Sequence, residues 1–505
     1  MASFIIRRLI ASIFVLFAAT FLMYILTSFA GDPLDELRQS NAPNKAELIE
    51  SRTRLLNLDV PPPLRYFLWL GGIFRGDFGV SVQGQPVNAL LGNAITATLT
   101  LVTTATIVAI VLGISVGIVS ALRQYSGFDY FVTFLSFLFF SLPIFWVAVL
   151  LKQYGAIEIN NWLADPTFAI PVIIVVSLLA GLLWMSVIGG TWKRRLIIFV
   201  ISALATGAVM TYLSLTRWFS DPSIGIVVYS ALAIGIAFGV TAVSTGLQNR
   251  RALYVALGIA GAGIALYYPM MTSLLNGMTL GLFVVYAVAT VLVCGAVGWF
   301  LGGADRGPVV RTAALTGVLV AAFIALEKYM QYWEAYSNSS RIRGRPIATV
   351  GASTPGLGGN FWVQGIDLFT HLLLPTIAII LVSFASYTRY SRASLLEVMN
   401  QDYIRTAKAK GLTQRTVVVR HAFRNALIPI TTIIAFDVGA IVGGAVITET
   451  VFGWTGMGRL FVDGLNAVDP NPVMAFFVVT GALAVLFNLV ADLVYAALDP
   501  RIKVG

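Results

Sequence analysis

Long apolar runs alternate with short polar connections along the whole chain. The runs are about 20 residues long, which is the length that a helix needs to cross a bilayer. They lack the alternation over about ten residues that marks transmembrane strands. We therefore predict an all-α, polytopic helical membrane protein with about twelve spans. The predicted spans are roughly 9–30, 94–121, 130–151, 168–190, 196–214, 224–245, 252–272, 279–301, 309–327, 367–388, 428–448 and 473–497.

Basic residues divide unevenly between the two sides of this pattern. With the N-terminus placed in the cytoplasm, most Lys and Arg fall in inner connections, including 193–195, 250–251 and 391–425. Cytoplasmic loops carry such an excess, so we predict an even number of spans and cytoplasmic N- and C-termini. Two longer outer segments remain, at 31–93 and 328–366. The second contains RIRGR, against the rule, but the rule weakens for long loops.

Composition supports a membrane protein. The chain is 58% hydrophobic and 11% charged, whereas soluble domains carry about 25% charged residues. The net charge of +10 suggests nucleic acid at first sight, but the basic residues cluster at the ends of spans. We therefore predict contact with a lipid bilayer and no nucleic acid. The N-terminus looks like a signal peptide, but its apolar stretch is too long, so we predict a retained first helix.

The sequence contains no pattern of an enzyme. Its single cysteine, Cys294, and its two distant histidines do not form a metal cluster. GxxxxGK[ST], GxSxG and HExxH are all absent. We predict no catalytic residue, no metal and no cofactor in this chain.

One cytoplasmic loop, at 390–427, combines many basic residues with a regular pattern. Gly411 separates two runs compatible with helices; Asp402 can serve as an acid at the start of the first, and Thr413 can cap the second. Such a helix–glycine–helix unit can present a short helix to a groove in another protein. Taken alone, the residues fit ordinary positive-inside charges better than a docking site. The candidate residues are Asp402, Arg405, Ala407, Ala409, Lys410 and Gly411.

Five segments, in order, resemble the membrane permease subunits of ABC importers for dipeptides and oligopeptides. They are LNLDVPPPLRYFLWLGGIFRGDFGVS (56–81), SLPIFW (141–146), QDYIRTAKAKGLTQRTVVVRHAFRNALIP (401–429), GGAVITETVFGWTGMGRL (443–460) and NLVADLVYAALDPRIK (488–503). The resemblance implies a six-helix permease core made of 1–152 and 366–505. The segment 153–365 adds about six further spans between the third and fourth of that core. The resemblance says nothing about this inserted membrane domain.

The resemblance also implies a function and a set of partners. The chain would form half of the pathway of an ATP-driven peptide importer in the bacterial inner membrane. The implied partners are a second permease subunit, one or two ABC ATPase subunits that hold ATP and magnesium, an extracytoplasmic substrate-binding protein and the peptide itself. The loop 390–427 would then be the coupling loop that docks on an ATPase subunit.

Ionisable residues inside spans are functional candidates. Asp437 either lines the pathway or forms a hydrogen bond with a neighbouring helix, and the sequence does not decide between the two. The segment after this span supplies Glu449, Trp454 and Met457 as candidates for the pathway or an outer gate. An interfacial aromatic belt explains Trp454 equally well. The alternative function is a proton-coupled secondary transporter that uses Asp437, although we find no paired broken helices.

Local patterns predict three further features. Pro143 is expected to kink the third span. Asp492 is expected to fix helix packing or the last helix end, together with Arg501. GxxxG pairs at 113/117, 235/239 and 439/443 suggest close helix contacts, although chance matches are common in a chain with 46 glycines.

Overall fold

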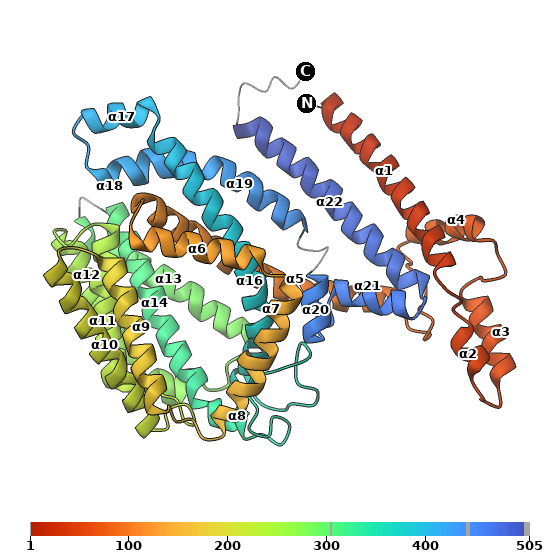
Figure 1. Cartoon of the computed structure of the whole chain (residues 1–505), viewed down its shortest axis with the longest axis horizontal. Helices are drawn as coiled ribbons and strands as arrows, with labels where there is room; N and C mark the ends of the chain where they lie inside the picture. The colour runs from red at the N-terminus through yellow and green to blue at the C-terminus, as the bar shows by residue number, and fades with distance from the viewer. Residues whose placement is uncertain (1, 304–305, 441–444, 499–505) are drawn as a thin grey trace. The chain divides into compact units, whose positions relative to one another are not determined.

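The computed structural model is built from helices (Figure 1). It describes residues 2–303, 306–440 and 445–498. Within these ranges no β-strand forms, and the one isolated bridge pairs Val80 with Pro86. This confirms the predicted all-α fold. The chain separates into two compact units, the first comprising Met1–Ala156, Thr349–Ala352 and Leu372–Gly505, and the second Ile157–Ala348 and Ser353–His371. The division into functional domains at 152/153 and 365/366 stays a prediction.

The first unit contains both ends of the chain. Its N-terminal helices are α1 (Ala2–Phe29), α2 (Asp35–Gln39), α3 (Lys45–Leu55), α4 (Pro62–Ile73), α5 (Val87–Leu122), α6 (Gly127–Ser141) and α7 (Ile144–Leu150). Its C-terminal helices are α17 (Asp402–Ala409), α18 (Gln414–Thr416), η4 (Val417–Ala422), α19 (Phe423–Ala440), α20 (Val446–Phe452), α21 (Met457–Asn466) and α22 (Pro470–Leu498). Helix α16 (Phe361–Met399) belongs to this unit from Leu372 onward.

Helices α5 and α16 approach closely because two glycines face the contact. A Cβ atom at Gly113 would lie 2.6 Å from the Cβ of Tyr387, and one at Gly117 would lie 2.6 Å from the carbonyl oxygen of Thr388. This confirms the contact suggested by the first GxxxG pair. In contrast, a Cβ at Gly235 or Gly239 would meet no atom within 4 Å, so that suggestion is wrong. The pair at 439/443 extends outside the described residues.

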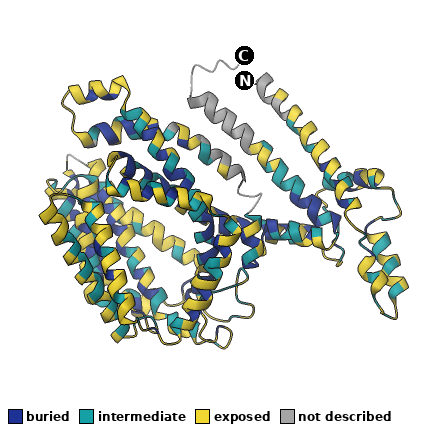
Figure 2. Ribbon diagram, viewed as in Figure 1, coloured by how far each residue is buried: buried dark blue, intermediate teal, exposed yellow. Residues whose placement is uncertain are grey.

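The second unit is a bundle of antiparallel helices. After η1 (Leu151–Glu158) the helices are α8 (Ile159–Leu163), α9 (Ile170–Ile188), α10 (Trp192–Leu215), α11 (Gly225–Ser244), α12 (Arg250–Pro269), η2 (Met270–Leu274), α13 (Leu280–Leu301), α14 (Arg306–Gln331) and α15 (Trp333–Ser337). The side chains of Tyr229, Tyr267 and Trp362 are buried in its core. Helix α13 is exposed along the apolar stretch that would cross a membrane (Figure 2).

Two neighbouring charged residues of α14 form hydrogen bonds with backbone groups at the ends of other helices in this bundle. The buried carboxylate of Glu327 accepts hydrogen bonds from the backbone N–H of Ile224 at 2.6 Å, where α11 begins, and from the Tyr267 hydroxyl at 2.9 Å. Lys328 Nζ donates to the carbonyl oxygen of Met271 at 2.6 Å. Each charge thus faces the helix end of opposite polarity, which is the favourable arrangement.

Among the described residues, nine helices are long and apolar enough to cross a membrane, or ten if one bent pair counts as a single span. That pair is Gly127–Ser141 and Ile144–Leu163, which meet at an angle of 102°. The bend falls at Pro143, as predicted. Two more predicted spans, 428–448 and 473–497, fall on α19 and α22, parts of which lie outside the described side chains. The count of twelve stays a prediction.

Candidate coupling loop and pathway residues

The candidate coupling loop, 390–427, contains α17, a short helix whose inner face is apolar. Gln401 precedes it in an extended conformation, and Asp402 supplies an acid in the first turn, where a negative charge favours the helix dipole. Ile404 and Ala407 lie one turn apart and are buried. They pack with Leu395 of α16, Ala121 of α5 and three residues that follow the turn, Val417, Ala422 and Ala426.

The turn after α17 requires a glycine. Gly411 has a φ of +74°, and a Cβ built there would meet no atom within 4 Å. The requirement is therefore conformational rather than steric, because residues with a side chain are strained in the left-handed region. The Oγ1 atom of Thr413 then accepts a hydrogen bond from the backbone N–H of Thr416 at 3.3 Å. The predicted cap is thus present, although the helix it starts changes to a π-helical turn at Val417.

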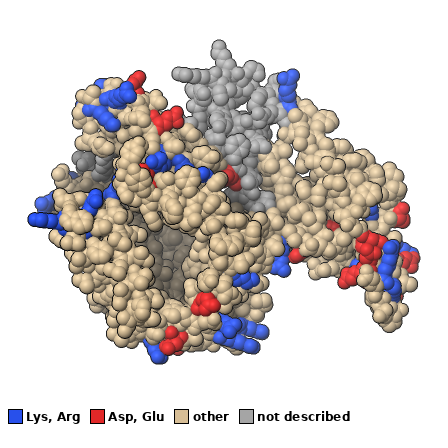
Figure 3. All heavy atoms as spheres, viewed as in Figure 1, with Lys and Arg blue, Asp and Glu red and all other residues tan. Residues whose placement is uncertain are grey.

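The outer face of α17 is basic and open to its surroundings (Figure 3). Arg405, Ala409 and Lys410 are exposed, and Asp402 Oδ1 lies 3.5 Å from Arg405 Nη1. An exposed pair of this kind contributes about 0.2–1 kcal/mol, so it leaves the charges free to meet a partner. Ala407 is the exception among the six candidates, because it points inward. Its role in docking stays a prediction, but the buried side chain would act by holding α17 in place.

Two polar contacts attach the loop to the helices that flank it. Asn425 Nδ2 donates to the Tyr403 hydroxyl at 2.8 Å, and Ser394 Oγ donates to the carbonyl oxygen of Ala426 at 2.8 Å. The first ties α17 to α19, and the second ties α16 to α19. The loop is therefore a packed helical unit, not a flexible connection.

Asp437 of α19 is an exposed carboxylate with one described contact. The Tyr387 hydroxyl donates to Asp437 Oδ2 at 2.6 Å, and the Tyr387 side chain on α16 is buried. A contact with a neighbouring helix thus exists, as one of the two interpretations expected. Exposure of the carboxylate leaves the second interpretation, a place on the pathway, open as well.

Glu449, Trp454 and Met457 form a compact polar and aromatic cluster instead of an open surface. The Glu449 side chain is fully buried and accepts hydrogen bonds from Thr98 Oγ1 at 2.7 Å and from the backbone N–H groups of Gly458 at 2.7 Å and Arg459 at 3.2 Å. Its carboxylate therefore caps the N-terminus of α21. Burial raises the pKa of Glu449, and these three hydrogen bonds oppose that rise only in part.

The other two candidates complete this cluster. Trp454 Nε1 donates to the carbonyl oxygen of Ala97 at 2.9 Å, and the Met457 N–H donates to Thr98 Oγ1 at 2.7 Å. Both side chains are buried. A glycine is needed on the segment between them, because a Cβ at Gly456 would lie 2.5 Å from Glu449 Cδ. Their roles as gate residues stay a prediction, and in this conformation they hold α20, α21 and α5 together.

Two polar residues of the first unit with well-defined partners are not among the candidates predicted from the sequence. Asp129 in α6 forms a two-point ion pair with Arg392 of α16, one of the basic residues in the range 391–425. Asp469, between α21 and α22, accepts a hydrogen bond from the Val82 N–H at 2.7 Å, and burial raises its pKa to about 6. The pattern Ser126-x-x-Asp129 is a helix-start signal and could have drawn attention to the first.

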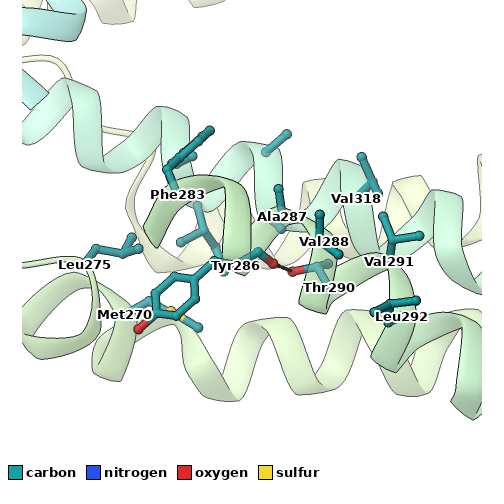
Figure 4. Close-up of a pocket in the computed structure, with 14 residues that line it drawn as sticks. Met270, Leu275, Phe283, Tyr286, Ala287, Val288, Thr290, Val291, Leu292 and Val318 are labelled. Atoms are coloured by element: carbon teal, nitrogen blue, oxygen red, sulfur yellow. Dashed lines mark hydrogen bonds between the residues drawn. The ribbon is translucent and has the colours of Figure 1, made fainter. Parts of the chain in front are cut away.

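One hollow of the second unit is apolar (Figure 4). It encloses about 490 Å³ between α13, α14 and η2, and side chains such as Phe283, Val288 and Val318 line it. No charged residue lines it, and the Thr290 hydroxyl is already bonded to the carbonyl oxygen of Tyr286 at 2.8 Å. It offers nothing that would fix the charged ends of a peptide.

The helices and their apolar surfaces define a multi-pass membrane protein. Comparisons with known proteins show which membrane proteins it resembles. Residues 312–504 match the family of binding-protein-dependent transport system inner membrane components. The chain is similar to this family over that segment, and it is also similar to oligopeptide and dipeptide permease proteins. These relatives are described as permease proteins of peptide transport systems.

Three relatives illustrate the match. The oligopeptide transport system permease protein OppB of Mycobacterium tuberculosis (strain H37Rv) is 27% identical over 505 residues, covering all of both chains. The oligopeptide permease protein AppB of Bacillus subtilis is 24% identical over 508 residues, again covering both chains in full. The dipeptide permease protein DppB of Escherichia coli (strain K12) is 42% identical over 148 residues, which is 29% of this chain and 42% of the relative.

Proposed function

We propose that the chain forms half of the translocation pathway of an ATP-driven importer for dipeptides or oligopeptides. The observation that carries this proposal is the construction of α17. Its outer face presents Arg405 and Lys410, whereas its inner face packs Ile404 and Ala407 against α16 and α5. A partner that moved the outer face would displace the helices behind it, as a coupling element must.

The partners follow from this arrangement and from the relatives. An ABC ATPase subunit with an acidic groove would receive α17, since opposite charges steer and orient such contacts. ATP and magnesium would be held by that subunit. A second permease subunit would supply the other half of the pathway, and an extracytoplasmic binding protein would deliver the peptide. Both termini of this chain would lie in the cytoplasm.

Gly411 gives the direct test of coupling. Gly411→Val forces a β-branched residue to a φ of +74°, which is strained by about 1–2 kcal/mol. Gly411→Asn is the matched control, because asparagine tolerates this region. In proteoliposomes that contain the full complex, we expect Gly411→Val to lower peptide uptake per ATP hydrolysed and Gly411→Asn to preserve it. Equal uptake per ATP in both variants would refute the coupling role.

Asp437 gives a test of the pathway. We propose that its exposed oxygen meets the ammonium group of a peptide in transit, while the Tyr387 hydroxyl holds the other oxygen at 2.6 Å. Asp437→Asn should then slow uptake of a free dipeptide and leave uptake of its N-acetylated form unchanged. If both peptides slow equally, the residue serves packing. The alternative, proton-coupled transport through Asp437, predicts that a protonophore abolishes uptake while ATP is present, whereas ATP-driven import continues.

A further inference from the structure

A buried ion pair joins α6 to α16 close to the coupling loop. Arg392 Nε donates to Asp129 Oδ1 at 2.8 Å, and Arg392 Nη2 donates to Asp129 Oδ2 at 2.9 Å. The Asp129 side chain is 3% exposed and that of Arg392 is 28% exposed. This parallel, two-point geometry fixes the orientation of both side chains as well as their separation.

The carboxylate of Asp129 also fixes the turn between α5 and α6. Ser120 Oγ, near the end of α5, donates to Oδ1 at 2.5 Å, and the Tyr125 N–H donates to Oδ2 at 3.0 Å. Ser126 caps α6 by accepting from the Asp129 N–H at 3.2 Å. A carboxylate has about four acceptor positions, and donors from three segments use all of them here. Asp129 is therefore a junction between α5, α6 and α16.

This junction is continuous with the packing beneath the coupling loop. Arg392 precedes Leu395 by three residues on α16, and Leu395 packs with Ile404 and Ala407 of α17. On α5, Ala121 belongs to the same cluster and follows Ser120 directly. The inner face of α17 therefore rests on the last turns of α5 and α16, the two helices that Asp129 connects to α6.

We propose that the Asp129–Arg392 pair positions the α5–α6 turn so that a displacement of α17 is passed to α6. This inference rests on the proposed function and deepens it by naming where motion of the coupling loop enters the membrane helices. Neither residue contacts substrate. Without the pair, α16 and α17 would move while α6, with its bend at Pro143, stayed behind.

A conservative variant separates positioning from simple stability. Arg392→Lys retains the positive charge but removes the two-point geometry, since an ammonium group is a single point charge. In the reconstituted complex we expect assembly and basal ATP hydrolysis to persist and peptide uptake per ATP to fall about 2- to 30-fold, the range that residues of a coupling network span. Asp129→Asn should have the same effect, and the double variant Asp129→Asn/Arg392→Lys should be no worse than either single change.

Two control variants define the result that would overturn the inference. Glu327→Gln replaces a buried carboxylate of the second unit with a neutral amide and so weakens its hydrogen bond with the Ile224 N–H. Asp463→Asn removes the exposed ion pair with Arg459. If Arg392→Lys changes only the melting temperature, as Glu327→Gln should, and leaves uptake per ATP unaltered, the pair is structural and the proposal is wrong. Asp463→Asn should change neither quantity.

A second measurement does not depend on the ATPase partners. Ile404→Ala loosens α17, and hydrogen exchange then reports whether the Tyr125 amide responds. We expect faster exchange of this amide in the wild-type background and no response in the Arg392→Lys background. Failure of the wild-type chain to recruit ATPase subunits would count against the proposed function alone, whereas an identical Tyr125 response in both backgrounds would count against the ion pair alone.

Discussion

The capping carboxylate of Glu449 makes the sharpest prediction about the fold of the first unit. It accepts hydrogen bonds from two backbone N–H groups at the start of α21, those of Gly458 and Arg459. It also accepts a hydrogen bond from the Thr98 hydroxyl, whose oxygen accepts from the Met457 N–H. The first four N–H groups of a helix have no partner within the helix. Removal of this one side chain should therefore release the start of α21 locally, without unfolding the rest of the unit.

The expected loss of local stability follows from the hydrogen-bond donors that each substitution leaves without an acceptor. In Glu449→Ala three donors lose their acceptor, and at about 1–3 kcal/mol for each unsatisfied buried group the local stability should fall by roughly 3–5 kcal/mol after partial relaxation. In Glu449→Gln the amide oxygen can still face Gly458 and Arg459, while the NH₂ group faces Thr98. Only one bond and the charge–dipole term are then lost, about 1–2 kcal/mol in total.

Hydrogen exchange of the Met457, Gly458 and Arg459 amides, in protein embedded in lipid nanodiscs, measures this directly. A loss of about 1.4 kcal/mol corresponds to tenfold faster exchange, so we expect about tenfold for Glu449→Gln and at least a hundredfold for Glu449→Ala. Asp463→Asn, on the exposed side of the same helix, should leave the three rates unchanged. Rates within twofold of wild type in Glu449→Ala would refute the capping role.

Four further outcomes are expected. Gly117→Ala should lower the melting temperature, because its Cβ would lie 2.6 Å from a carbonyl oxygen and overpacking costs about 1–3 kcal/mol. Gly235→Ala should raise it slightly, since the site is open and alanine favours a helix by about 0.5–1 kcal/mol. The folded pKa of Asp469 is raised to about 6, above the unfolded value of about 3.9, so stability should fall as pH rises from about 4 to 6. Exchange of the Val82 amide, corrected for its intrinsic pH dependence, should accordingly be slower at pH 5 than at pH 7. Finally, deletion of 157–348 should leave a chain that still co-purifies with its partners, whereas a deletion extended to 360 should not. The longer deletion also removes Gly351, whose N–H donates to the Phe452 carbonyl oxygen at 2.9 Å.

The sequence predicted the helices better than their contacts, for physical reasons. Apolar runs of membrane length impose helices because backbone groups must be satisfied within the segment, so most predicted ranges coincide with helices. Pro143 bends the third span because proline lacks an N–H group. Both effects act within one element. By contrast, Gly113/Gly117 and Gly235/Gly239 have the same spacing, and only the neighbouring helix, which the sequence does not reveal, distinguishes a contact from an open face.

The coupling loop shows the same limit at the level of single residues. Gly411 and Thr413 were predictable because turn and cap chemistry depends on a few neighbouring residues. Ala407 and Ala409 are both small residues of α17, yet one is buried and the other exposed. The difference arises because Leu395 and Ala121 approach only one face of the helix. A pattern of small and basic residues does not show which face of the helix is buried against the rest of the chain.

Buried and exposed carboxylates of the first unit differ in the number of donors that reach them. Asp129 and Glu449 each accept at least three hydrogen bonds from backbone and side-chain donors, so their acceptor positions are largely used within the chain. Among the described residues, Asp437 has one donor, the Tyr387 hydroxyl, and is exposed. An acid whose oxygens are saturated has little capacity left for a ligand, whereas one with an open oxygen retains it. The sequence analysis named Asp437 for its position within a span and Glu449 for the segment that follows, and it did not name Asp129. The number of donors assigns Asp129 and Glu449 to the architecture of the first unit and leaves Asp437, of these three acids, with the most acceptor capacity for a ligand.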